Sequence, residues 1–93
     1  MTDPDWITRL DLLPEGARSR LRRYIEEGYG ASLSTFYRAV LSNDLIGAIQ
    51  GGDAENIAAL AAFVEYLTAY APAGCYGNAA KVQDWRGLSR ERN

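Results

Sequence analysis

The chain has 93 residues, of which 47% are hydrophobic and 24% charged, and its formal net charge at pH 7 is −2. This length fits one domain, and the apolar content is typical of a folded globular protein. The slightly negative charge excludes a general nucleic-acid binder, because such proteins need a clear excess of basic residues. We therefore expect a single domain over residues 1–93 that does not bind DNA.

Residue counts also restrict chemistry and location. A single cysteine, Cys75, excludes an internal disulfide, and the absence of histidine excludes a Cys/His metal site and the usual Ser–His or Cys–His nucleophile pairs. No phosphate-cradling glycine motif occurs, so no cofactor is implied. The N-terminus has no signal segment, and no apolar run approaches ~18 residues. We expect a non-enzymatic, cytoplasmic protein that does not cross a membrane.

The N-terminal segment, residues 1–13, starts with Asp3-Pro4, a pair typical of the first turn of a short helix. Its apolar side chains fall on one side of that helix: Trp6, Ile7, Leu10 and Leu13. The sequence leaves open whether this segment packs on its own domain or on a neighbouring subunit.

Residues 14–27 have the pattern of an amphipathic helix that Pro14 opens and Gly28 ends. The expected inward residues are Ala17, Leu21, Tyr24 and Ile25. The arginines that face mainly outward are Arg18, Arg20, Arg22 and Arg23. Two of them form four-residue pairs, Arg22–Glu26 and Arg23–Glu27. This face is either a solvated surface with weak ion pairs, or Arg18 and Arg22 form half of an anion or partner site.

The next helix is expected to begin between Ser32 and Thr35, with Leu33, Phe36, Tyr37, Val40 and Leu41 on its apolar side. The hydroxyls of Ser32, Ser34 and Thr35 and the free N–H groups of a first turn suit a phosphate or carboxylate. Simple N-capping by Ser32 or Ser34 explains them equally well. Because residues 33–42 contain only one basic residue, Arg38, a DNA-reading helix-turn-helix is disfavoured.

Asn43 or Asp44 is expected to cap a short helix through Ile49, which Gly51-Gly52 stops. Asp53 then caps a strongly apolar helix that Pro72 ends. The residues of this helix that recur at three- and four-residue steps are Ile57, Leu60, Ala61, Val64, Leu67 and Ala71. We expect a helix of this composition to be surrounded by the others.

After a loop at 73–78, Asn78 is the predicted N-cap of a last helix over residues 79–90, with Val82, Trp85 and Leu88 inward. Cys75 is interpreted as a structural cysteine, because only Lys81 lies near enough in sequence to favour a thiolate. The fold prediction is therefore all-α: a compact bundle of four to five helices around residues 53–71. Residues 14–88 form its core, and residues 89–93 are a frayed tail. The modest core and many aromatic side chains predict a homo-oligomer.

Much of the chain resembles a family of small helical proteins of bacteriophages and prophages. The resemblance covers residues 14–86, and its most distinctive piece is Ala39 to Leu45. The other matching positions are residues 23–26, Gly28, residues 35–38, Asp53, Asn56, Ala59-Leu60, Val64, Ala71-Pro72, Cys75, Gly77, Lys81-Val82 and Trp85. Ser34-Thr35-Phe36 replaces the usual Gly-Ser-Phe, and Tyr76 replaces a Trp. The resemblance implies a phage accessory protein that counters host defence and carries no settled enzymatic function.

Several polar and aromatic residues are not obviously needed by the fold, and they would suit a nucleotide if they converged. They are Arg22, Arg23, Tyr29, Ser34, Thr35, Arg38, Asn43, Asp44, Tyr76, Asn78, Lys81 and Trp85. We expect the loop after Pro72 to lie at the same end of the bundle as the start of the helix near Ser32. The leading hypothesis is sequestration of a small anionic ligand, such as a cyclic nucleotide or an ADP-ribose derivative. The alternatives are a protein-binding inhibitor or assembly factor with an apolar, Arg-rich face, and purely structural roles for these residues.

Overall fold

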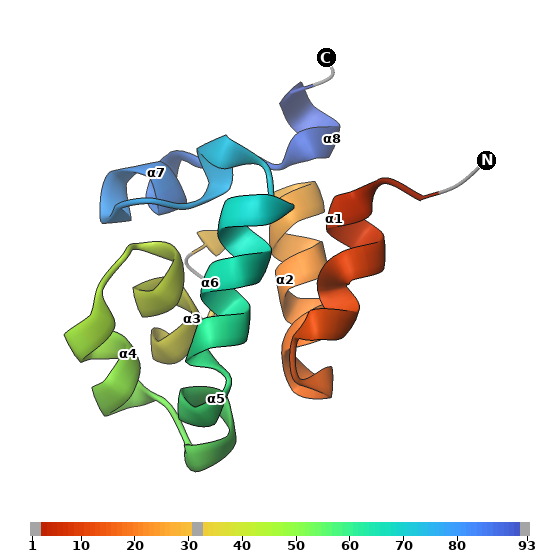
Figure 1. The fold of residues 1–93 in the computed structure, drawn as a ribbon. Helices are drawn as coiled ribbons and strands as arrows, with labels where there is room; N and C mark the ends of the chain where they lie inside the picture. The colour runs from red at the N-terminus through yellow and green to blue at the C-terminus, as the bar shows by residue number, and fades with distance from the viewer. Residues whose placement is uncertain (1–2, 31–32, 92–93) are drawn as a thin grey trace.

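The computed structural model describes residues 3–30 and 33–91, and the described residues contain helices but no strand (Figure 1). The predicted all-α fold is confirmed. In chain order the elements are α1 (Asp5–Thr8), η1 (Arg9–Leu12), α2 (Glu15–Glu27), α3 (Thr35–Leu41), α4 (Leu45–Gly51), α5 (Ala54–Ala58), α6 (Leu60–Ala69), η3 (Ala73–Cys75), α7 (Ala79–Asp84) and α8 (Leu88–Glu91).

The helix predicted over residues 53–71 is present as two pieces, α5 and α6, which meet at Ala59. Asp53 caps the first piece as predicted, since its carboxylate accepts a hydrogen bond from Asn56 N at 2.8 Å. At the junction, the N–H of Ala59 is shared between the carbonyls of Glu55 and Asn56, which tightens the last turn of α5. The chain can therefore change direction without a proline or a glycine.

Helix α6 is central, but it is not surrounded on every side. Phe63, Tyr66 and Leu67 are buried, and the Phe63 ring meets the Phe36 ring of α3 edge-on at 5.5 Å between centroids. The expectation that Val64 and Ala61 also face the core is wrong, because Val64 is 55% exposed and Ala61 is exposed as well. The sequence pattern placed six residues on the buried face, but only one narrow side of α6 packs against the rest of the chain.

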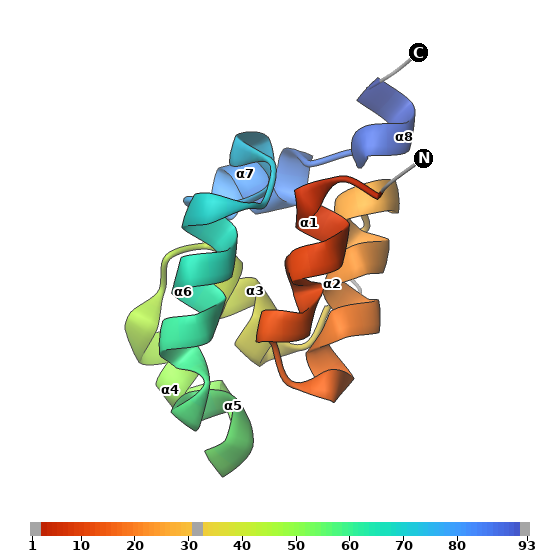
Figure 2. The same cartoon turned by 45° about the vertical axis from the view of Figure 1, so that its right-hand side comes forward.

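The N-terminal segment packs on its own chain, with α1 and η1 beside both α6 and α2 (Figures 1 and 2). The Tyr66 hydroxyl donates to the carbonyl of Trp6 at 2.5 Å, and Leu10 and Leu13 are buried. Arg18 Nε donates to the Leu13 carbonyl at 2.9 Å, which satisfies a backbone acceptor next to η1.

Helix α2 has the predicted character. Its buried residues are the four expected ones, Ala17, Leu21, Tyr24 and Ile25. Both predicted ion pairs are present on its outer face, Arg22–Glu26 at 3.5 Å and Arg23–Glu27 at 3.8 Å. Gly28 ends the helix with a φ of 90°, a conformation that glycine adopts easily.

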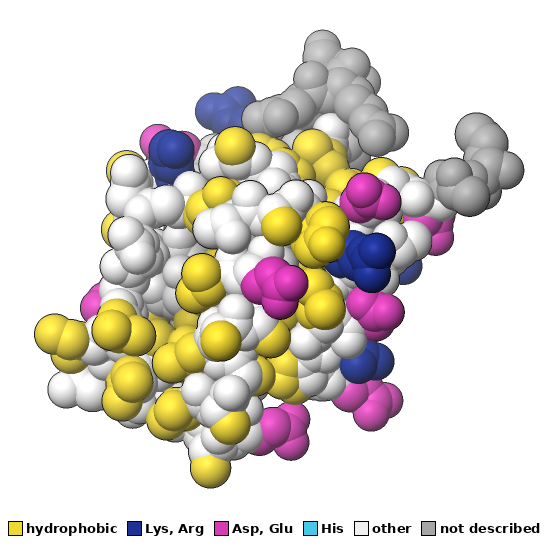
Figure 3. Space-filling model, in the orientation of Figure 1, with side chains coloured by type: hydrophobic (Ala, Val, Ile, Leu, Met, Phe, Trp, Pro, Cys, Tyr) yellow, Lys and Arg dark blue, Asp and Glu magenta, His cyan; other side chains and the backbone are white. Residues whose placement is uncertain are grey.

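Helix α4 begins as predicted but presents an apolar surface. Asp44 caps it by accepting a hydrogen bond from Gly47 N at 2.9 Å. Of its seven residues only Ala48 is buried. The helix packs mainly against α3. Leu45, Ile46 and Ile49 are exposed, and hydrophobic side chains gather over α4 and α5 at the lower left of Figure 3.

The C-terminal part differs from the prediction. Asn78 caps α7 as expected, but the helix ends at Asp84 instead of Arg90. Gly87, with a φ of 92°, turns the chain into α8, where the Ser89 hydroxyl donates to the carbonyl of Glu26 at 2.7 Å. Residues 89–91 are part of α8, and residues 92–93 lie outside the described part.

Candidate functional site

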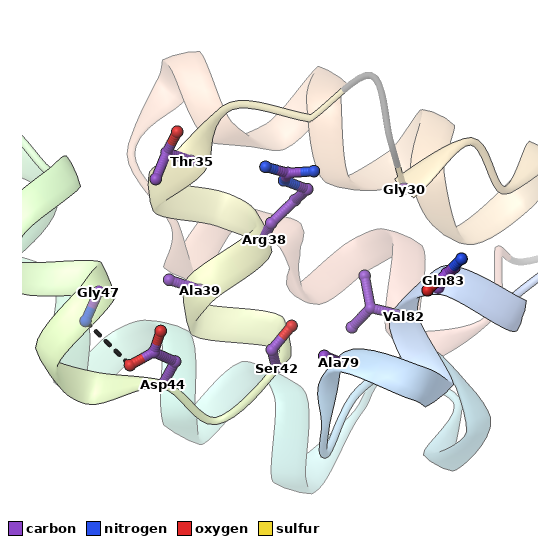
Figure 4. A pocket seen from close by; sticks show the side chains of 10 residues that line it. All are labelled: Gly30, Thr35, Arg38, Ala39, Ser42, Asp44, Gly47, Ala79, Val82 and Gln83. Carbon is purple, nitrogen blue, oxygen red and sulfur yellow. Dashed lines mark hydrogen bonds between the residues drawn. The ribbon is translucent and has the colours of Figure 1, made fainter.

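A half-open pocket of about 620 Å³ lies between α3, the start of α4 and α7 (Figure 4). Three of its lining residues, Thr35, Arg38 and Asp44, belong to the predicted ligand-binding set. The others are Gly30, Ala39, Ser42, Gly47, Ala79, Val82 and Gln83. The pocket exists because α7 packs beside α3, so that residues about 40 positions apart in sequence face the same space.

Arg38 is the cationic group of this pocket. It lies on the exposed side of α3, one helical turn before Ser42, and its backbone N–H is bonded to the carbonyl of Ser34. No described residue forms a hydrogen bond or an ion pair with its guanidinium. A planar guanidinium offers five N–H donors that match the oxygens of a phosphate or a carboxylate. The free donors make Arg38 the natural anchor for an anionic ligand.

Asp44 places a carboxylate in the same pocket. One of its oxygens, Oδ1, accepts the α4 capping hydrogen bond from Gly47 N. A carboxylate has acceptor capacity beyond one bond, so Asp44 can also accept from ligand N–H or O–H groups. With the hydroxyls of Thr35 and Ser42 and the amide of Gln83, the lining offers both donors and acceptors.

A second hollow of about 640 Å³ adjoins the first, since both are lined by Gly30 and Gln83. It contains Tyr29, whose φ of 63° is in the left-handed region that bulky residues rarely occupy. Asn43 has the same φ of 63°, although asparagine tolerates it well. The remaining lining residues are Glu27, Asp84, Trp85 and Arg86. Two of these are acidic and one is basic, so this hollow has no clear preference for anions.

Seven predicted site residues line neither pocket: Arg22, Arg23, Ser34, Asn43, Tyr76, Asn78 and Lys81. The predicted convergence at the start of α3 is wrong in its geometry. The loop after Pro72 reaches the opposite end of α3, where Gly77 N donates to the carbonyl of Leu41 at 2.7 Å. Asn78 is occupied in capping α7 through Lys81 N at 2.9 Å.

The hydroxyl-rich start of α3 also behaves differently from the prediction. Ser34 is the N-cap residue, but its side chain makes no capping hydrogen bond. Ser32 lies outside the described residues. Thr35, the first residue of α3, lines the same pocket as Arg38. Sequence reasoning missed Ser42 and Gln83, whose roles depend entirely on α7 lying beside α3.

Trp85 belongs to the core, in agreement with the structural alternative. Its indole Nε1 donates to the carbonyls of Tyr24 and Ile25 at 3.1 and 3.3 Å, and its side chain is buried. These two contacts tie the end of α7 to the last turns of α2. Trp85 also lines the second hollow, although only 7% of it is exposed.

Cys75 is a buried structural cysteine. Burial raises the pKa of its thiol to about 12, which suppresses the reactive thiolate at neutral pH. Its carbonyl accepts a hydrogen bond from the Tyr24 hydroxyl at 2.7 Å. Burial, with a smaller effect of Cys75, raises the pKa of the Tyr24 and Tyr66 hydroxyls as well.

Within residues 3–30 and 33–91, no group of three or more Cys, Asp or Glu side chains is arranged to hold a metal ion. In the same ranges, none of the helices has the length and apolar character needed to cross a bilayer. Comparisons with protein-family models, with curated proteins and with solved structures find no match for this chain. Only the geometry of the candidate site therefore indicates what it can bind.

Proposed function

We propose that this protein binds and holds a small anionic ligand in the pocket between α3 and α7, without transforming it. The observation that carries the proposal is Arg38, whose guanidinium has no partner among the described residues and lines a pocket of about 620 Å³. That volume falls in the range of small-molecule sites. The lack of histidine and the high pKa of the Cys75 thiol favour binding over catalysis.

A nucleotide is the ligand class that we place first. Arg38 would bind phosphate oxygens, and Asp44 would accept hydrogen bonds from N–H groups on a base edge. The apolar wall of Ala39, Ala79 and Val82 would contact a base or a ribose. None of the described lining residues of this pocket is aromatic, so base stacking would require Tyr29 in the adjoining hollow. With the phage-protein resemblance, this leads to sequestration of a nucleotide immune signal as the biological role.

The alternative, an inhibitor or assembly factor with an Arg-rich face, has less support. Arg18 is engaged by the Leu13 carbonyl, and Arg22 and Arg23 are each paired with a glutamate of α2. The charges of Arg22 and Arg23 are thus partly compensated within the chain, unlike that of Arg38. A protein partner recognised by this face would have to displace those contacts.

The test is thermal unfolding of the purified full chain with cyclic di- and trinucleotides, ADP-ribose derivatives and inorganic phosphate. A ligand at ~100 times its Kd adds about 2.7 kcal/mol to the free energy of unfolding, which raises Tm by several degrees in a domain of this size. Arg38→Ala should abolish the shift. Arg20→Ala, an exposed arginine of α2 that lines neither pocket, should retain it. An unchanged shift in Arg38→Ala, or no shift with any compound, would contradict the proposal.

A further inference from the structure

Tyr29 lies in the turn between α2 and α3, and the glycine on each side of it fits tightly against the chain near the end of α7. A Cβ atom at Gly28 would be 2.9 Å from the carbonyl oxygen of Trp85. A Cβ atom at Gly30 would be 2.9 Å from the carbonyl oxygen of Val82. Side chains at these two positions would therefore collide with backbone atoms, and the packing of the turn fixes the chain on both sides of Tyr29.

The backbone conformation of Tyr29 is unfavourable for its residue type. Its φ of 63° lies in the left-handed region, which glycine and asparagine adopt easily and a bulky residue does not. Tyr29 is also 53% exposed, so it is not part of the hydrophobic core. Strain of this kind persists where the surrounding structure imposes it, and it is concentrated at functional sites such as ligand clamps. A strained, exposed aromatic residue in a closely packed turn therefore indicates a role in binding.

Tyr29 lines the second hollow, of about 640 Å³, which adjoins the Arg38 pocket. The residues that line both hollows are Gly30 and Gln83, and in Figure 4 they lie at the end of the Arg38 pocket opposite Asp44. Arg38 lines only the first hollow and Tyr29 only the second. One ligand of sufficient length can therefore occupy both hollows and contact both side chains.

The charges of the two hollows set the direction of such a ligand. The second hollow contains the carboxylates of Glu27 and Asp84 and the guanidinium of Arg86, so a phosphate is more favourable beside Arg38 in the first. Carboxylates accept hydrogen bonds from amino groups, and an aromatic ring offers a face on which a base can stack. The second hollow thus suits an uncharged planar ring that carries N–H donors.

We propose that the second hollow is the subsite for an aromatic base, which stacks on Tyr29 while the phosphate of the same ligand binds Arg38. This inference rests on the proposed function, and it narrows the ligand class to nucleotides whose base carries an amino group. The ribose would cross the boundary at Gly30 and Gln83. In a dinucleotide, the second base would lie at the Asp44 end of the first pocket.

The test is isothermal titration calorimetry of the full chain with AMP, GMP, CMP, UMP, cyclic di-AMP and cyclic di-GMP. Ribose 5-phosphate is the matched compound that has the phosphate and the sugar but no base. The base-carrying compound that binds best should bind about tenfold or more tightly than ribose 5-phosphate, since one stacked base typically provides a difference of this order. UMP should bind more weakly than that compound, because uracil has no amino group for the carboxylates.

Tyr29→Asn removes the ring and keeps a residue that tolerates a φ of 63°. It should weaken binding of the base-carrying compounds about fivefold or more and leave ribose 5-phosphate unchanged. Tyr29→Phe keeps the ring and should bind like the wild type. Arg38→Ala should weaken all compounds, with or without a base. The unliganded Tyr29→Asn and Tyr29→Gly variants should have Tm values no lower than the wild type, because both residues relieve the backbone strain.

The outcomes separate this inference from the proposed function. If Arg38→Ala abolishes binding but Tyr29→Asn binds every base-carrying compound like the wild type, the base subsite is refuted and the anion site stands. Tightest binding by UMP would have the same meaning. A Tm several degrees below the wild type in both Tyr29→Asn and Tyr29→Gly would assign Tyr29 to the fold and overturn the inference. No binding of any compound would overturn both proposals.

Discussion

Helices α2 and α4 show how differently two apolar-patterned segments can be used in one small protein. Helix α2 has 13 residues, buries four of them and covers its outer side with charged residues. Helix α4 has seven residues, buries only Ala48 and leaves three large aliphatic side chains in solvent. The first is a structural element of the core. The second supplies a wall of the candidate pocket on one side and an apolar surface on the other.

The difference follows from what each helix packs against. Residues of α2 contact η1 and α8, and Trp85 from the end of α7 donates to its last carbonyls. Helix α4 is held mainly by α3. A helix that packs mainly against one other helix can bury only one narrow side, so the rest of its apolar surface stays exposed whatever the sequence pattern suggests.

The largest effect should come from removing a core side chain of α2. Leu21→Ala should lower the free energy of unfolding by about 2–5 kcal/mol, because Leu21 is fully buried and the substitution leaves a cavity. Ile46→Ala on α4 should change it by less than about 0.5 kcal/mol at low micromolar protein. Urea unfolding measures both. Equal losses would show that α4 packs more closely than its exposure indicates.

An intermediate effect should appear at alkaline pH, and it should arise from the core next to α2. The Cys75 thiol has an ordinary value of 9.0 and a pKa of about 12 when folded, so the unfolded chain loses this proton first. The free energy of unfolding should therefore be fully retained below pH 9. It should then fall by up to about 1.4 kcal/mol per pH unit between pH 9 and 12. Residues 45–51 contain no titratable group, so α4 adds nothing to this dependence.

Cys75→Ala is the variant that isolates this effect. Its urea midpoint should change less between pH 8 and pH 10 than that of the wild type. Above pH 10 the buried Tyr24 and Tyr66 hydroxyls should restore a decline, since their pKa values are raised as well. An identical pH dependence in the two proteins would exclude the thiol as its source.

A smaller effect should come from the cap of α4. Asp44→Ala removes the acceptor for Gly47 N and should lower the free energy of unfolding by about 1 kcal/mol. Asp44→Asn keeps an acceptor oxygen and should retain most of that stability. The same pair of variants sharpens the ligand proposal, because Asp44→Asn keeps one acceptor oxygen for the cap but removes the second oxygen and the charge that would serve a ligand. A loss as large in Asp44→Asn as in Asp44→Ala would show that the charge, and not the cap, stabilises this helix.

Local features of the fold could be predicted well from the sequence. The caps Asp44, Asp53 and Asn78 each act on a backbone N–H three residues later, so the necessary information lies within one turn. The inward side of α2 is set by the 3.6-residue period of its own side chains. The break at Ala59 was missed because no proline or glycine occurs there. The break after Asp84 contains Gly87, but a single glycine inside a helical pattern does not by itself predict the end of a helix.

The site was predicted less well, since it is made by pairs of segments far apart in the chain. Arg38, Thr35 and Asp44 were identified by residue type, but Gln83 and Ser42 were not. The expected meeting of the 73–78 loop with the start of α3 was wrong, since the loop bonds to Leu41 at the other end. The spacing of apolar residues within a helix does not indicate which end of that helix a distant loop will contact.

The sequence by itself determined the all-α class, the main capping residues and the buried side of α2, because these depend on hydrogen bonds and side-chain spacing within a few residues. Only the tertiary structure decided that α7 lies beside α3 to form a pocket around Arg38, and that α4 packs mainly against α3. Those outcomes depend on which apolar helix faces pack against one another in a small core. A chain of 93 residues cannot bury all of its apolar side chains, and packing selects the ones that stay exposed.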